Sequence, residues 1–246
     1  MRRLEVLAVE GLPEVHPGDD LAQLIATHSS LVDGDVVVVA QKVVSKAEGC
    51  LRRLSEVTAS AEAERIAPLL IAAPDPRFVQ IVLDESVRVV RSERILITET
   101  RHGFVAANGG VDHSNVPGDD FVTLLPDDPD ASARRICDRL QAAVGVKVGV
   151  VISDTFGRPW RLGIVNVALG LAGVPPVRDL RGTFDDSGKS LHATVLAVAD
   201  DLAAAAGLVM AKTNRVPVVV IRGFDFEGEP GAGRDMVRPA GEDLFR

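Results

Sequence analysis

The sequence predicts an α+β fold in which mixed β-sheets carry flanking helices. Continuous β-branched runs at residues 36–40, 148–152 and 216–221 indicate buried strands. Shorter runs between residues 87 and 107 are separated by charged turns, which indicates an antiparallel sheet. Apolar residues recur at helical spacing in segments between these strands. We therefore expect one domain spanning residues 1–246, arranged as two intimately joined lobes.

The first half of the chain is expected to begin with a strand at residues 4–9. Residues 10–18 then form a loop that two prolines and two glycines stiffen. Asp19 and Asp20 open a helix at residues 21–28, because acidic side chains suit a helix N-terminus. Beyond the strand at 36–40, helices are expected at 58–72 and 77–83, followed by strands at 87–90, 95–98 and 103–107.

The second half is expected to alternate helices with the two remaining buried strands. Asp130 is interpreted as the cap of a helix. Residues 227–238 are rich in glycine, proline and charge, which predicts a mobile tail. The predicted helices lie at 131–143, 162–172 and 193–206.

Composition excludes several classes of function. A formal net charge of -8 leaves no basic excess, so general nucleic-acid binding is not expected. No apolar stretch approaches the ~20 residues that span a bilayer, and the N-terminus lacks a secretory pattern. We therefore expect a cytoplasmic protein without membrane association. Cys50, Cys137 and the five histidines lack metal-ligand spacing, so any metal is expected to have oxygen ligands.

A buried strand leads into a cluster of oxygen and guanidinium side chains at residues 148–161. Asp154 and Thr155 are expected at the mouth of this strand, because a turn-forming glycine and proline follow them. A carboxylate and a hydroxyl can bind a hard cation such as Mg²⁺ or Mn²⁺, and Arg158 can neutralise phosphate oxygens. The alternative is that Asp154 and Thr155 cap a following helix and that Arg158 pairs with Asp154.

Two further segments carry side chains suited to phosphate or metal. The loop at residues 108–118 combines adjacent glycines with Asp112 and Asn115, which can face one ion or nucleotide. An Asx-turn at a hairpin tip is the alternative. Segment 41–49 carries two lysines at a strand end, where lysine can bind phosphate or merely solvate an edge strand. The GxxxxGK[ST] pattern is absent there, which excludes a P-loop.

Six unrelated blocks occur in the order and spacing of a known family: GLPE at 11–14, DGDVVVV at 33–39, VVSKAEG at 43–49, ITET at 97–100, GVDHSNV at 110–116 and SDTFGRPWR at 153–161. With these blocks the chain resembles the coenzyme F420 γ-glutamyl ligase family, the coenzyme F420-0:L-glutamate ligases, nearly from end to end. It is also similar to the N-terminal ligase domain of actinobacterial fusion members, which continue into a nitroreductase-like domain. A stand-alone ligase and a shortened fusion protein both stay open.

The resemblance implies a homodimeric, GTP-dependent ligase that adds L-glutamate to the lactyl carboxylate of coenzyme F420-0. It implies Mg²⁺ or Mn²⁺, with K⁺ as a further candidate ion. By position, the implied metal ligands are Asp112, Asp154 and Thr155. The implied catalytic residues are Asp154, Lys46 and Arg158. The implied nucleotide-binding residues are Leu12, Pro13, Glu14, Val15, Gln41, Lys46, Asn115, Met210, Ala211, Lys212, Thr213 and Asn214.

Two positions depart from the family. Gln41 stands where relatives often have a serine, and Lys212 stands where some relatives offer a side-chain oxygen to a second metal. A protonated lysine cannot ligate, so the second cation binds differently or Lys212 meets a phosphate itself.

The chemistry of amide formation predicts an acyl phosphate. A carboxylate is a poor electrophile, so the ligase first phosphorylates it and releases GDP, after which the glutamate amine displaces phosphate. Phosphoryl transfer needs metal ions and positioned cations around the phosphate oxygens. The base that deprotonates the amine stays open among Glu14, Glu48 and His113. The rival functions are a non-catalytic nucleotide- or metal-binding module and a related amide ligase with a different acceptor.

Overall fold

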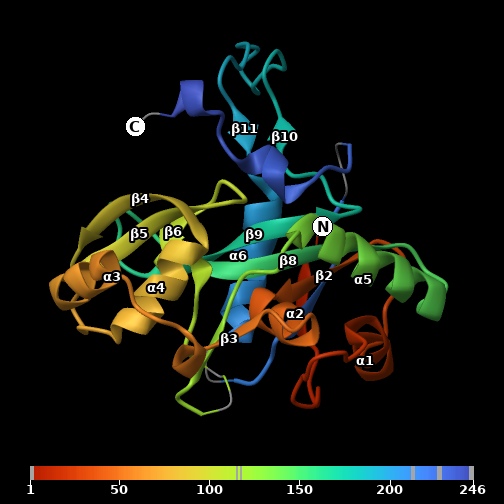
Figure 1. Ribbon diagram of the computed structural model, residues 1–246. Coiled ribbons are helices and arrows are strands. Elements are labelled where there is room, and N and C mark those ends of the chain that lie inside the picture. The colour runs from red at the N-terminus through yellow and green to blue at the C-terminus, as the bar shows by residue number, and fades with distance from the viewer. Residues whose placement is uncertain (1–2, 115, 117, 212–213, 226–228, 244–246) are drawn as a thin grey trace.

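A five-stranded mixed sheet with strand order β1-β12-β2-β8-β9 forms the centre of the molecule (Figure 1). The computed structural model describes residues 3–114, 116, 118–211, 214–225 and 229–243. Neighbouring strands are antiparallel except β2 and β8, which run parallel. The predicted α+β class with mixed sheets is therefore confirmed. The strand bounds are β1 (Glu5–Ala8), β12 (Val218–Arg222), β2 (Asp35–Ala40), β8 (Val148–Gly157) and β9 (Ile164–Ala172).

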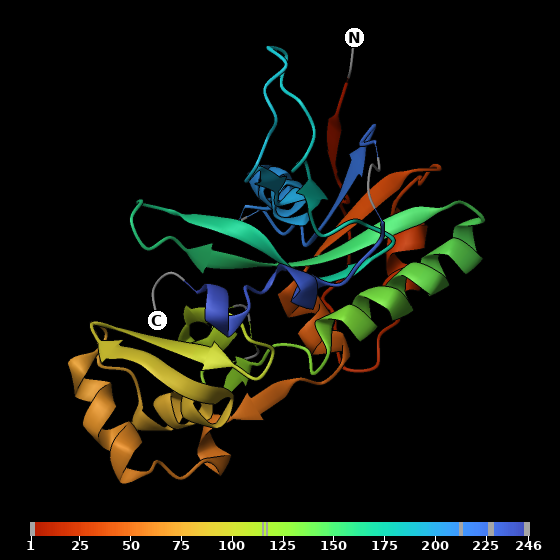
Figure 2. The same ribbon diagram turned by 90° about the horizontal axis from the view of Figure 1, so that it is seen from above.

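Helices cover both faces of this sheet (Figure 2). One face packs against α1, α2 and α5, and the other packs against α6. No helix in the described ranges is both long and apolar enough to cross a membrane. The helix bounds are α1 (Leu21–His28), α2 (Gln41–Ala47), α5 (Pro129–Val144) and α6 (Val198–Met210).

Alternating valines hold β2 at the centre of the sheet. Val37 and Val39 pack with α1 and α5, whereas Val36 and Val38 pack with α6. All four side chains are fully buried. Full burial of a valine side chain contributes about 1.5–3 kcal/mol, so both layers are anchored on this strand.

A second sheet has a hydrophobic core of its own. The antiparallel strands β4, β5 and β6 pack with α3 and α4, and a short pair, β3 with β7, borders them. The bounds are α3 (Ala61–Ile66), α4 (Pro76–Asp84), β3 (Leu51–Arg53), β4 (Ser86–Glu93), β5 (Ile95–Thr100), β6 (Val105–Ala107) and β7 (Phe121–Thr123).

The remaining elements are short. A hairpin of β10 and β11 projects from the body of the molecule in Figure 1. The bounds are β10 (Arg178–Asp179) and β11 (Val195–Leu196), with 3₁₀ turns at Leu54–Glu56, Ala67–Leu69, Asn108–Gly110, Gly233–Met236 and Ala240–Glu242.

A local signal placed the first helix correctly. The Asp20 side chain caps α1 by accepting a hydrogen bond from the Gln23 amide at 3.3 Å. The helix predicted at 58–72 is shorter than expected, because α3 ends at Ile66 and a 3₁₀ turn that contains Pro68 follows. Proline has no amide hydrogen and disfavours the interior of a helix.

The helix predicted at residues 162–172 is wrong, because this segment is β9. It forms a hairpin with β8, in which Thr155 lies opposite Asn166. Its small residues serve close packing: a Cβ at Gly170 would lie 2.2 Å from the carbonyl oxygen of Pro129, where α5 begins. The glycine and alanine content of β9 therefore reflects the close approach of α5 to this strand.

Two further predictions need correction. Segment 41–49, interpreted as a strand end, contains α2, which starts directly where β2 stops. The helix predicted at 193–206 is displaced, because α6 begins at Val198 and β11 occupies part of the expected range.

Asp130 is not the cap of α5. Asp128 caps this helix by accepting a hydrogen bond from the Ala131 amide at 2.9 Å. The buried Asp130 carboxylate instead accepts hydrogen bonds from the amides of Leu171, at 2.9 Å, and Gly233, at 2.6 Å. It thus connects the C-terminal segment to β9. Part of the tail that was predicted to be mobile therefore makes specific contacts.

Asp130→Ala is expected to destabilise the protein by about 1–3 kcal/mol, because two buried amides lose their acceptor. For a chain of this size the melting temperature should fall by ~2–4 °C per kcal/mol. Thermal unfolding measures the effect. Asp138→Ala, at an exposed position of the same helix, is the matched control, and equal melting of both variants would contradict the assignment.

Candidate functional site

The candidate site lies where the parallel strands β2 and β8 end. Ala40, the last residue of β2, pairs with Ser153 of β8, and α2 begins at the next residue, Gln41. β8 continues beyond this point, paired with β9, as far as Gly157. The first turn of α2 therefore lies beside Ser153 and Asp154.

The sequence had predicted that Asp154 and Thr155 lie at the mouth of the strand. In the structure both lie within β8. No helix follows them, so the interpretation as a helix cap is wrong. Their side chains leave opposite faces of the sheet, because side chains alternate along a strand. Ile152 packs with α1 and α5, and Asp154 shares its face.

Thr155 faces the α6 side of the sheet. Its hydroxyl lies 3.3 Å from Oδ1 of Asn166, and Nδ2 of Asn166 lies 3.5 Å from Sδ of Met210 at the end of α6. The side chains of Asp154 and Thr155 therefore do not converge, although the sequence suggested that both serve one metal.

Asp112 is fixed beside α2 by its backbone and its side chain. Its backbone forms an isolated bridge with Thr123. One carboxylate oxygen accepts a hydrogen bond from Nζ of Lys42 at 2.7 Å, and the other accepts one from the Ser114 amide at 2.7 Å. Burial raises the pKa of this carboxyl, but the bonds from Lys42 and Ser114 outweigh burial, so the pKa lies below its usual value. Asp112 is thus an anion near neutral pH.

The same helix presents Lys46 to the loop at 10–18. Nζ of Lys46 lies 2.5 Å from Oε1 of Glu14, and the Lys46 side chain is almost buried whereas that of Glu14 is 66% exposed. The two lysines of α2 therefore serve two different loops.

Gln41 has a structural role in this arrangement. Its Nε2 donates hydrogen bonds to Oγ of Ser45, at 2.6 Å, and to the carbonyl oxygen of Leu124, at 2.8 Å. Leu124 follows Thr123, the bridge partner of Asp112. Gln41 thus helps to hold the Asp112 segment against α2.

The other predicted site residues are less closely connected. Arg158 is exposed and donates a hydrogen bond to the carbonyl oxygen of Leu162 in the turn between β8 and β9. Leu12 and Val15 pack into the core, and Met210 ends α6. The backbone amide of Asn214 donates to the carbonyl oxygen of Ala211 at 3.4 Å, and Pro13 is exposed. Asn115, Lys212 and Thr213 lie outside the described residues.

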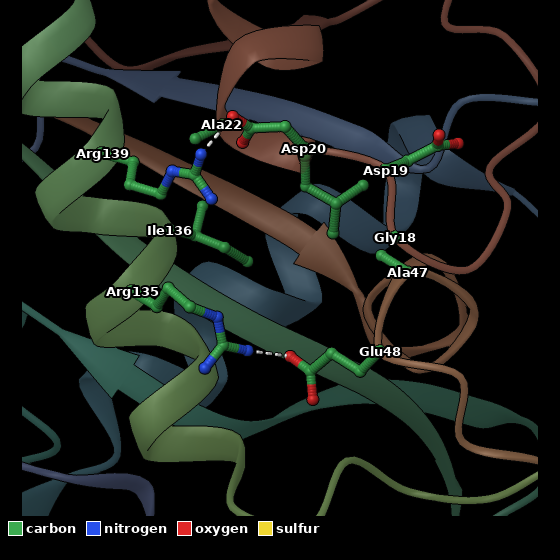
Figure 3. Close-up of a pocket in the computed structure, with 10 residues that line it drawn as sticks. Gly18, Asp19, Asp20, Ala22, Ala47, Glu48, Arg135, Ile136 and Arg139 are labelled. Carbon is green, nitrogen blue, oxygen red and sulfur yellow. Dashed lines mark hydrogen bonds and ion pairs between the residues drawn. The ribbon is translucent and has the colours of Figure 1, made fainter.

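A cleft with a volume of about 120 Å³ lies between α1, α2 and α5, and Figure 3 shows the residues that line it. Four of its charged side chains form two ion pairs: Arg135 pairs with Glu48, and Arg139 pairs with Asp20. Glu48, one of the three candidate bases, therefore has a cationic partner. None of the residues implied as catalytic, nucleotide-binding or metal-binding lines this cleft.

Sequence reasoning assigned no role to Ser114 or Asn166, and it considered Lys42 only as one of two lysines at a strand end. The signal for Lys42 was present, since Lys42 and Lys46 are four residues apart and lie on one face of a helix. This spacing was not recognised, because segment 41–49 was interpreted as a strand end. Among the described residues, no group of three or more histidine, cysteine, aspartate or glutamate side chains gathers as a metal site.

Comparisons with known proteins agree over the whole chain. A family model described as F420-0:Gamma-glutamyl ligase matches residues 11–223. The coenzyme F420:L-glutamate ligase of Methanothermobacter thermautotrophicus is 45% identical over 252 residues, with 99% of both chains covered. The ligase of the same name from Haloarcula marismortui is 46% identical over 248 residues, which cover 99% of this chain and 96% of that one. The Methanocaldococcus jannaschii ligase is 40% identical over 249 residues, with 100% and 98% covered.

An α+β fold that gathers an aspartate and two lysines at one end of a parallel strand pair, together with these matches, defines the class of the protein as a ligase. The chain belongs to the F420-0:gamma-glutamyl ligase family.

Proposed function

We propose that this chain adds L-glutamate to the lactyl carboxylate of coenzyme F420-0 in a GTP-dependent reaction. The observation that carries this proposal is the 45% identity to a coenzyme F420:L-glutamate ligase over 99% of both chains. We also propose that residues 1–246 act as a single cytoplasmic ligase domain with two intimately joined lobes of the family's fold. The separate hydrophobic cluster around α3 and α4 supports the division into lobes.

The reaction proceeds in two steps. An oxygen of the substrate carboxylate attacks the γ-phosphorus of GTP, so that an acyl phosphate forms and GDP leaves. The glutamate amine then attacks the acyl carbon, inorganic phosphate leaves, and the nitrogen loses a proton. Lys46 supplies positive charge near the phosphates in the first step, and Arg158 is a further candidate cation. Asp154 contributes to catalysis as a ligand of the metal.

Asp112 and Asp154 are the proposed ligands for Mg²⁺ or Mn²⁺. Their donors fit such ions, because carboxylate oxygens are hard ligands and Asp112 already carries a cation, the Lys42 ammonium. The Thr155 hydroxyl is occupied by Asn166, so Thr155 would offer its backbone carbonyl oxygen instead. A bound divalent ion would neutralise charge on the phosphate oxygens during transfer. K⁺ remains a proposed additional ion.

The nucleotide is proposed to bind along α2 and its neighbouring loops. Lys46 is nearly buried and holds Glu14, so this lysine already faces the loop at 10–18. Gln41 acts through the position of α2, because its amide nitrogen is bonded to Ser45 and Leu124. The residues proposed for the nucleotide site, Gln41 through its effect on α2, are Leu12, Pro13, Glu14, Val15, Gln41, Lys46, Asn115, Met210, Ala211, Lys212, Thr213 and Asn214.

The chain is further proposed to form a homodimer. Trp160 and Leu162 in the turn between β8 and β9 are exposed, as is Ile164 at the start of β9, and Leu162 is 96% exposed. Phe184, between β10 and β11, is also exposed. Apolar side chains in such numbers on projecting segments favour an interface with a second copy.

Mass spectrometry tests the proposed function directly. Protein, GTP, Mn²⁺, L-glutamate and coenzyme F420-0 are mixed, and the product should carry one added glutamyl unit, whereas omission of GTP should give none. GDP release without a change in the mass of F420-0 would favour an amide ligase with a different acceptor. Nucleotide binding without GDP formation would favour a non-catalytic module.

A further inference from the structure

Lys42 holds the Asp112 loop with all the hydrogen bonds that an ammonium group can donate. Its Nζ lies 2.7 Å from Oδ2 of Asp112, 2.8 Å from the carbonyl oxygen of Ser114 and 2.6 Å from Oγ of Ser114. A lysine has three N–H donors, so none is left for another partner. The side chain is only 19% exposed.

Both carboxylate oxygens of Asp112 accept hydrogen bonds. Oδ2 accepts from Lys42, and Oδ1 accepts from the Ser114 amide. A divalent cation that binds Asp112 through Oδ2 must therefore compete with a positive charge 2.7 Å from that oxygen. The positive charge of the ammonium repels a second cation at the same oxygen and so lowers its affinity.

Lys46 differs from Lys42 although both lie on α2. The printed partner of Lys46 is the exposed Glu14, which is not a proposed metal ligand. Removal of the Lys46 side chain would therefore leave the contact between Asp112 and Lys42 unchanged. This difference between neighbouring turns of one helix allows the two lysines to be tested against each other.

We propose that Lys42 occupies Asp112 in the nucleotide-free protein and thereby couples divalent-metal binding to nucleotide binding. The inference rests on the proposed metal role of Asp112. When a triphosphate binds, its oxygens accept the Lys42 ammonium, and Asp112 becomes available to the metal. Each ligand then raises the affinity for the other by the same factor, as thermodynamic linkage requires. Lys42 is in this sense a positioning residue for the loading of the site.

The test is a titration of the full chain with Mn²⁺, in which electron paramagnetic resonance measures free Mn²⁺. Each variant is titrated alone and with the non-hydrolysable GTP analogue GMPPNP. In the wild type, the analogue should tighten Mn²⁺ binding by a factor within the usual range for coupled sites, about 5- to 150-fold. Lys42→Met should tighten nucleotide-free Mn²⁺ binding about tenfold and reduce the coupling factor towards one.

Matched variants separate this role from a structural one. Lys46→Met should leave nucleotide-free Mn²⁺ affinity unchanged, and Lys42→Arg, which keeps the charge, should retain coupling. Circular dichroism and thermal melting establish that each variant is folded. If Lys42→Met does not fold, Lys42→Gln, which keeps hydrogen-bond donors without the charge, takes its place with the same expected direction.

Two results would overturn the proposal in distinguishable ways. Unchanged nucleotide-free Mn²⁺ affinity in folded Lys42→Met, while Asp112→Asn loses Mn²⁺ binding, would reject the coupling role and keep the metal site. Mn²⁺ binding that Asp112→Asn does not alter would reject the metal site itself, and with it this inference.

Discussion

Asp154→Asn is expected to lower the rate of glutamyl transfer by at least about a hundredfold, with the fold intact. The substitution keeps the size of the side chain but removes the anionic ligand that the proposed mechanism uses to hold the metal beside the phosphates. Loss of one group that stabilises the charge of the transition state commonly costs about 10²–10³ in rate. Asp154 lies on the α2 face of β8, one residue beyond the pairing of Ser153 with Ala40.

The variant should be assayed for GDP release and for glutamyl addition, with its melting temperature measured in parallel. Asp138→Asn, at an exposed position of α5, is the matched control and should retain full activity. Normal turnover by Asp154→Asn would show that this carboxylate has no part in the reaction. A large fall in melting temperature would instead indicate a structural role.

Gly170→Ala is expected to lower the free energy of unfolding by at least about 3 kcal/mol. The added Cβ would lie 2.2 Å from the carbonyl oxygen and 2.3 Å from the carbonyl carbon of Pro129. These are backbone atoms at the start of α5, so no side-chain rotation can relieve the contact. Either α5 moves away from β9 or the strand shifts, and both disturb the packed layer around Ile136 and Leu140.

Thermal and urea unfolding measure this effect. At ~2–4 °C per kcal/mol, the melting temperature should fall by roughly 6–12 °C. Gly157→Ala is the matched control, because Gly157 also lies in a strand of the same sheet and a Cβ there meets nothing within 4 Å. Equal stability of the two variants would contradict the close approach of α5 to β9.

Sequence reasoning succeeded where the signal was local. Asp20 was predicted to open α1, and its side chain caps that helix. The valine run of β2 could be recognised as a buried strand because β-branched residues favour the pleated, enclosed environment of a central strand. The antiparallel sheet of β4, β5 and β6 was likewise predicted from short alternating segments with charged turns.

The failures concern tertiary contacts. Residues 162–172 contain alanines and glycines that suit a helix by composition, but their size is set by α5 on the neighbouring layer. The contact between Lys42 and Asp112 joins residues 70 positions apart, and no local pattern specifies it. The opposite orientations of Asp154 and Thr155 followed only when β8 was known to extend to Gly157.

The place of β12 in the sheet has a consequence for how the protein is made. β12 lies between β1 and β2, so β1 stays without its neighbour in the sheet until residues 218–222 have been synthesised. Until then one edge of the nascent β2 is open to pairing with other chains. A nascent chain that has not yet reached residue 218 therefore carries an incomplete sheet, and a product that ends before this residue is expected to aggregate.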